Sequence, residues 1–195
     1  MGRLGTTVVG AFLLTLLSCR GGPGEVTPLV KEDLDPEFAS YKDKLADIAI
    51  LPVEDATGAQ HGSLAPTLRR YVYQDLIAKY YTPLSLEAVD RVVAGLPAEA
   101  RSRPEAMLGK LQEDAALAIR LLQWDTTWFS RGKVLTGVSA TLIRSSDGKK
   151  IWELEIRDRY LDVPEGKRAE PADVRRDALL EVLARELTKG LPRRR

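Results

Sequence analysis

The sequence has little of the chemistry that usually marks an active site. Its 195 residues include one cysteine, Cys19, and one histidine, His61. A single cysteine excludes an internal disulfide, and one residue of each kind is too few for a typical zinc site. The sequence also lacks a phosphate-binding glycine loop. We therefore expect a protein that is not an enzyme and that needs no cofactor and no metal.

An excess of charge of either sign is also lacking. Arg3 is the only charged residue among the first 18, so the rest of the chain has 28 basic and 28 acidic residues. Proteins that bind nucleic acids usually carry a basic stripe or a basic domain, so we expect no nucleic-acid partner. The one basic cluster, Arg193–Arg195, is interpreted as a solvated chain end, with a lipid headgroup contact as the alternative.

Residues 1–18 have the features of an export signal. Arg3 supplies a positive charge, and Val8–Leu17 is apolar apart from two residues. Ten helical residues rise about 15 Å, half the thickness of a bilayer core of about 30 Å, so this run is too short to span a membrane. A charged start, a short apolar middle and a small residue at the end are typical of a signal peptide.

The four residues Leu16–Cys19 resemble the lipobox of bacterial lipoproteins. The resemblance implies that the chain is cut before Cys19, that the thiol carries a diacylglycerol and that the new amino group is acylated, for example with palmitate. An ordinary signal peptide with an incidental cysteine is the alternative. Several acyl chains on one residue form a lasting anchor, whereas one chain binds only marginally. The residue that follows the cysteine is Arg20 and not an aspartate. By the sorting rule of enteric bacteria, this favours the outer over the inner membrane.

The chain after Cys19 divides into a tether and one domain. Gly21–Gly24 contains proline and three glycines, which disfavour regular structure. We expect residues 19–44 to form the lipidated cysteine and a flexible tether, and residues 45–192 to form a single domain.

Hydrophobic periodicity predicts an α/β domain with the order β-α-β-α-α-β-β-β-α. The later strands alternate apolar and polar residues, which indicates a sheet with one covered face. We expect a mixed sheet of about five strands with helices packed on it, and a tight turn at Asp147–Gly148. The expected strands are 47–53, 80–84, 116–124, 133–143 and 151–157, and the expected helices begin after Ser63, after Ser85, at Pro104 and at Pro171.

Four stretches carry a resemblance to a family of bacterial lipoproteins: Ile48–Val53, Tyr80–Pro83, Leu122–Asp125 and Leu142–Trp152. That family is similar to the N-terminal domain of TolB and, more distantly, to the curli secretion lipoprotein CsgG. The resemblance covers about residues 45–160 and consists of strand and turn patterns, so no catalytic residue is carried over from it. It implies an α/β domain in the periplasm and a role in envelope assembly or secretion.

The stretch from Trp124 to Arg131 is unusually aromatic, with three of the chain's six Trp and Phe residues. These side chains are expected either to pack over the end of the sheet or to form a contact surface. Because aromatic and arginine side chains dominate binding hot spots, the candidate contact residues are Trp128, Phe129 and Arg131.

The loop after the first strand is the second candidate site. Glu54 and Asp55 lie at a strand end, where α/β sheets often bind ligands, and His61 follows in the same loop. Solvated side chains are the alternative for all three. Ser63 lacks the Gly-x-Ser-x-Gly context of a nucleophile, so we interpret it as a helix cap.

These observations favour a membrane-anchored periplasmic lipoprotein that acts as a non-catalytic interaction or assembly component of the cell envelope or of a secretion system. It would have a protein partner in the envelope. The alternative is a periplasmic domain that binds a small glycan or peptide near Glu54 to His61. The sequence does not indicate an oligomeric state.

Overall fold

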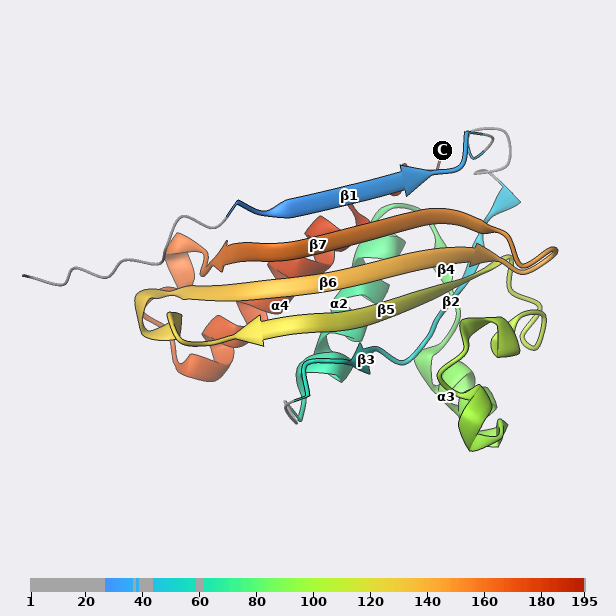
Figure 1. Cartoon of the computed structure of the whole chain (residues 1–195), viewed down its shortest axis with the longest axis horizontal. Coiled ribbons are helices and arrows are strands. Elements are labelled where there is room, and N and C mark those ends of the chain that lie inside the picture. Colours follow the sequence, from blue (N-terminus) through green and yellow to red (C-terminus); the bar gives the residue numbers. More distant parts are fainter. Residues whose placement is uncertain (1–26, 37, 39–43, 59–61, 195) are drawn as a thin grey trace, which may run out of the picture.

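The computed structural model describes residues 27–36, 38, 44–58 and 62–194 (Figure 1). Cys19, the expected signal peptide and His61 lie outside the described residues. The strands are β1 (Leu29–Leu34), β2 (Asp47–Ile50), β3 (Glu54–Asp55), β4 (Thr82–Pro83), β5 (Ala115–Asp125), β6 (Lys133–Arg144) and β7 (Lys150–Asp162). The helices are α2 (Leu64–Ala78), α3 (Leu86–Gly95) and α4 (Ala172–Thr188), with short 3-10 helices at Ala98–Ala100, Pro104–Met107, Phe129–Arg131 and Glu165–Lys167.

All the strands belong to one mixed sheet. Its order is β1-β7-β6-β5-β2-β4, and β3 pairs with β5 beside β2. The pairs β1–β7, β7–β6 and β6–β5 are antiparallel, whereas β2, β3 and β4 run in parallel pairs. The prediction of a single α/β domain with helices on a mixed sheet is confirmed.

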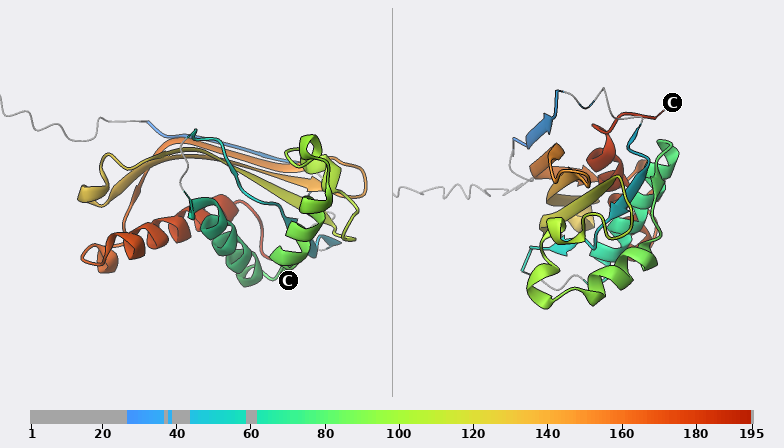
Figure 2. Two further views of the ribbon diagram at one scale, coloured as in Figure 1. Left: turned by 90° about the horizontal axis from the view of Figure 1, so that it is seen from below. Right: turned by 90° about the vertical axis from the view of Figure 1, so that its right-hand side faces the viewer.

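Helices α2 and α4 cover one face of the sheet (Figure 2). Each presents one apolar stripe because its leucine and valine residues recur at helical spacing. The stripe residues are fully buried, as the sequence predicts: Leu68, Val72 and Leu76 from α2, and Leu179, Leu183 and Leu187 from α4. Facing them are the predicted inward residues of β6 and β7, namely Val134, Thr136, Val138, Ala140, Leu142, Trp152, Leu154 and Ile156.

The opposite face of the three long strands carries polar side chains. Strand pairing places Arg120, Ser139 and Glu155 in one row across β5, β6 and β7. Thr141 and Glu153 form the next row. The alternation of β7 is therefore confirmed, with Glu153 and Glu155 on the side away from the helices.

The helix expected at Pro104 is wrong beyond its first turn. Pro104–Met107 is a 3-10 helix, and the chain then takes left-handed conformations at Gly109 (φ 74°) and Gln112 (φ 58°). The backbone N–H groups of Gly109 and Leu111 donate to the carboxylate of Glu113. Because that carboxylate replaces helical carbonyl acceptors, the helix does not continue.

The sheet extends into the segment for which the sequence predicts a tether. β1 pairs with β7 from Leu29 opposite Arg157 to Leu34 opposite Trp152. A little further along, Phe38 is buried in the main core. The charged centre of β1 gives it no apolar periodicity, so it carries no local strand signal.

The turn between β6 and β7 lies where Asp147–Gly148 predicts it. Asp147 accepts hydrogen bonds from the Arg144 guanidinium and from the backbone N–H of Lys149. The bond from Arg144 is the main reason that the pKa of Asp147 falls to about 2. Gly148 has a positive φ of 70°, which a glycine adopts without strain.

The end of the chain is fixed by the C-terminal end of α2. Lys79 donates its ammonium protons to the carbonyls of Thr188 (2.7 Å) and Leu191 (3.2 Å), and burial lowers the pKa of this lysine. Of the C-terminal basic cluster, Arg193 is exposed, and the backbone N–H of Arg194 donates to the carbonyl of Lys79. The third arginine lies outside the described residues. In the part of the chain that the structure describes, no helix combines the length and apolar character needed to cross a bilayer.

Candidate functional site

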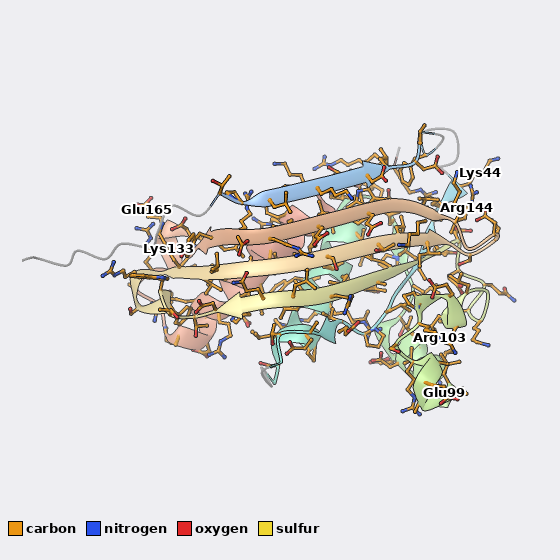
Figure 3. The ribbon with its side chains drawn as sticks, viewed as in Figure 1. Lys44, Glu99, Arg103, Lys133, Arg144 and Glu165 are labelled. Atoms are coloured by element: carbon orange, nitrogen blue, oxygen red, sulfur yellow. The ribbon has the colours of Figure 1, made fainter. Side chains whose placement is uncertain are left out.

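A cleft of about 740 Å³ lies on the polar side of the sheet. Its floor comes from the first half of β5, the second half of β6 and the start of β7, including Arg120, Thr141 and Glu153. Its wall comes from α3 and the segment that follows it, whose Glu99 and Arg103 are labelled at one corner of the molecule in Figure 3. The cleft combines apolar surface from Val93 and Met107 with charged side chains.

The charges in this cleft largely neutralise one another. Arg120 Nε lies 2.9 Å from Glu54 Oε2, and Lys150 Nζ lies 3.7 Å from Glu153 Oε2. Arg101 donates to the carbonyls of Leu96 and Ala94 at 3.0 Å. Such a surface has hydrogen-bond donors and acceptors for a neutral or zwitterionic ligand, and it has no strong field that would select an anion or a cation.

The structure does not bring Glu54 and Asp55 into one site. Glu54 lines the cleft with Arg120. The Asp55 carboxylate instead accepts hydrogen bonds from the N–H (3.0 Å) and hydroxyl (2.6 Å) of Thr57, as in an Asx turn. Among the described residues there is no cluster of three or more Asp, Glu, His or Cys side chains that could hold a metal.

Ser63 occupies the N-cap position of α2, as the sequence predicts, but its side chain makes no capping hydrogen bond. Its backbone carbonyl accepts the N–H of Thr67 at 3.0 Å. The position of the helix start is therefore confirmed, and the expected side-chain cap is not formed.

The aromatic turn between β5 and β6 begins at Asp125. Trp124 is a buried core residue one position before the end of β5, where the sequence predicts that the strand ends. The Asp125 carboxylate accepts hydrogen bonds from the hydroxyl (2.6 Å) and N–H (2.8 Å) of Thr127, and the hydroxyl contributes most to lowering the pKa of Asp125. Gly132 closes the turn in the left-handed conformation, with φ of 74°.

Trp128 and Phe129 have different surroundings, although they are adjacent. The Arg131 guanidinium lies 4.6 Å from the centre of the Trp128 ring, and Arg131 itself is exposed. Phe129 packs against the main core, and the Arg175 guanidinium from α4 lies 4.6 Å from its ring centre. Both aromatic residues are half-buried, so each is partly exposed to solvent.

Sequence reasoning missed Arg69, which connects three elements beside the cleft. Its Nε and Nη2 donate to the carbonyl of Ile50 at the end of β2, at 3.0 and 2.6 Å. Its Nη1 donates to Asp90 Oδ1 of α3 at 2.5 Å. The only signal in the sequence is that Arg69 lies next to Leu68, at the border of the apolar stripe of α2.

The sequence matches no protein-family model and no curated protein. Solved structures with similar folds exist. The PelC dodecamer from Paraburkholderia phytofirmans matches with a TM-score of 0.51 at 12% identity, covering 87% of this chain and 100% of that chain. Lipoprotein GNA1162 from Neisseria meningitidis matches with a TM-score of 0.49 at 16% identity, covering 75% of this chain and 99% of that chain.

At these identities the comparison with PelC establishes a shared fold and nothing more about this chain. It supports the α/β architecture expected from the sequence. The more specific resemblance to TolB and CsgG is not shown by these matches and stays a hypothesis.

Proposed function

We propose that this chain is a lipid-anchored protein of the bacterial cell envelope that works by binding other proteins and not by catalysis. The observation that carries the proposal is the lipobox-like Leu16–Cys19 ahead of one folded domain. The anchor would hold the domain on the periplasmic side of a membrane, with Arg20 favouring the outer one. The fold shared with PelC supports this assignment, because it provides an architecture already used in a protein assembly.

The surface best suited to a protein partner is the turn that carries Trp128 and Arg131. The two side chains stack at 4.6 Å, so the tryptophan is held in place before a partner binds. Rigid, half-exposed tryptophan and arginine residues are enriched at binding hot spots. This turn lies at the end of the sheet where β1 begins (Figure 1).

Trp128→Ala is expected to weaken partner binding while leaving the fold intact. Truncation of a hot spot typically costs 2 kcal/mol or more, or about a thirtyfold loss of affinity. The measurement is quantitative affinity capture of envelope proteins by the full chain, with the melting temperature recorded for each variant. Phe129→Ala is expected to lower the melting temperature instead, because Phe129 packs against the core.

Ile77→Ala provides a control for the loss of apolar surface, because Ile77 is apolar and exposed and lies on α2, away from the turn. It should change neither capture nor stability. Unchanged capture by Trp128→Ala, or a large loss of stability in that variant, would show that the residue only packs the turn.

The cleft favours a second function, the binding of a small glycan or peptide. Its volume of about 740 Å³ lies within the range of about 300–1,000 Å³ typical of ligand sites. A ligand at 100 times its dissociation constant should add about 2.7 kcal/mol to the stability. If the cleft binds a glycan or a peptide, thermal-shift screening with short peptides and oligosaccharides should show this increase in stability.

Arg120→Gln should then abolish the gain, because Arg120 lines the cleft. Arg176→Gln, an exposed change on α4, should leave it intact. If no compound in the panel stabilises the wild-type chain, the protein-binding function is favoured.

A further inference from the structure

Strand β1 is an exposed edge of the sheet, with apolar residues at both ends and charged residues in its centre. The exposed fractions of Leu29, Val30 and Leu34 are 54%, 51% and 43%. In the described part of the chain, these are three of the five large apolar residues that are exposed. An edge strand of this kind is a template for pairing with another strand. The opposite edge is β4, which has two residues and contains Pro83, so it is poorly suited to pairing.

The backbone of β1 presents regularly spaced hydrogen-bonding groups that have no partner among the described residues. The N–H of Asp35 donates to the carbonyl of Ile151, so this residue directs its backbone groups toward β7. In antiparallel strands this direction alternates from residue to residue. The residues Val30, Glu32 and Leu34 therefore direct their N–H and C=O groups outward, away from β7.

Side chains fix β1 in place on the sheet. The Trp152 indole donates to Glu32 Oε1 at 2.8 Å. Gly190, after α4, lies so close to this carboxylate that a side chain there would clash with it. At the end of the strand, Lys149 Nζ pairs with Asp35 Oδ2 at 2.6 Å. The outer edge is thus a rigid surface, which reduces the entropy cost of pairing.

We propose that β1 pairs with β1 of a second copy, antiparallel and about a two-fold axis, so that one sheet continues through two molecules. The axis would pass through Glu32. Val30 then lies opposite Leu34 of the second copy, and Lys31 lies opposite Asp33 of the second copy. Because of the symmetry each of these two pairings occurs twice, which gives two apolar pairs and two pairs of opposite charge, while Glu32 faces its own copy once, on the axis.

Pairing about an axis at Glu32 fits the side chains of β1 better than pairing about an axis one residue away in either direction. An axis at Lys31 or at Asp33 would place like charges directly opposite each other, which is destabilising. An axis at Glu32 also places like charges opposite each other, but only this axis pairs Val30 with Leu34, whereas each of the other two places an apolar residue opposite Glu32. Lys31 and Asp33 would form the non-hydrogen-bonded pairs, in which opposing side chains are closest.

Val30→Pro is the first test. Proline removes the outward N–H of residue 30 and leaves the hydrogen bonds to β7 intact, because Val30 makes none of them. Two donors are lost per dimer, so the dimer should dissociate about thirtyfold more readily. The measurement is sedimentation of the full chain in detergent over a range of concentrations. Ile77→Lys, which changes an exposed apolar residue elsewhere, should sediment as the wild type does.

Charge exchange tests the register independently of proline. Lys31→Asp and Asp33→Lys should each dissociate the dimer, because each places like charges opposite each other. The double variant should restore the dimer, since it exchanges the two signs. A wild-type chain that is monomeric at all concentrations would overturn the proposal. So would a closed ring of more than two copies, or a dimer that neither Val30→Pro nor the charge exchanges weaken.

Discussion

Replacing Cys19 by alanine is expected to move the protein almost completely from the membrane fraction to the soluble fraction. The lipobox-like sequence places all of the expected acyl chains on this one thiol and on its amino group. Each buried methylene contributes about 0.8 kcal/mol, so removing every chain removes the anchor. Labelled palmitate should be incorporated into the wild type and not into Cys19→Ala.

Ser18→Ala is the matched control, because it keeps a small residue before the cut. It should remain labelled and membrane-bound. A mature protein that begins at another residue and carries an unmodified Cys19 would contradict both the anchor and the proposed function. It would leave the β1 pairing intact, because that proposal depends only on residues of the folded domain.

Arg69→Met is expected to destabilise the fold strongly. Methionine retains the apolar stem but removes three hydrogen bonds, two of them to the buried Ile50 carbonyl. Leaving a buried acceptor unsatisfied costs about 1–3 kcal/mol, and the charged bond to Asp90 adds to this, so we expect a total of about 3 kcal/mol. At roughly 2–4 °C per kcal/mol, the melting temperature should fall by about 6–12 °C.

Asp90→Asn tests the ion pair between Arg69 and Asp90 separately from the hydrogen bonds between Arg69 and the Ile50 carbonyl. The Asp90 side chain is 52% exposed, so its pair with Arg69 is screened by solvent and the loss should be below about 1 kcal/mol. Arg69→Lys should fall between the two, because lysine cannot donate to Ile50 and Asp90 in the same geometry. Equal effects of Arg69→Met and Asp90→Asn in denaturant unfolding would show that the ion pair is the dominant contact, and not the carbonyl of β2.

The strand ends and helix faces that were predicted correctly are those governed by local periodicity. The leucine stripes of α2 and α4, the alternation of β7 and the turn at Asp147–Gly148 depend on residues within two to four positions of each other. Such spacing decides which face of an element is apolar before any neighbour is present. The sequence by itself therefore determined the fold class and the inward side of each long element. The lipobox-like motif is equally local, and its function stays a proposal.

Only the tertiary structure decided the features that depend on distant partners. β1 is a strand because β7 offers it an open edge, although its own residues are charged and without periodicity. Arg69 can be buried because it donates hydrogen bonds to the Ile50 carbonyl and to Asp90, which lie 19 and 21 positions from it in the sequence. These contacts join residues brought together by folding, and no spacing along the chain encodes them.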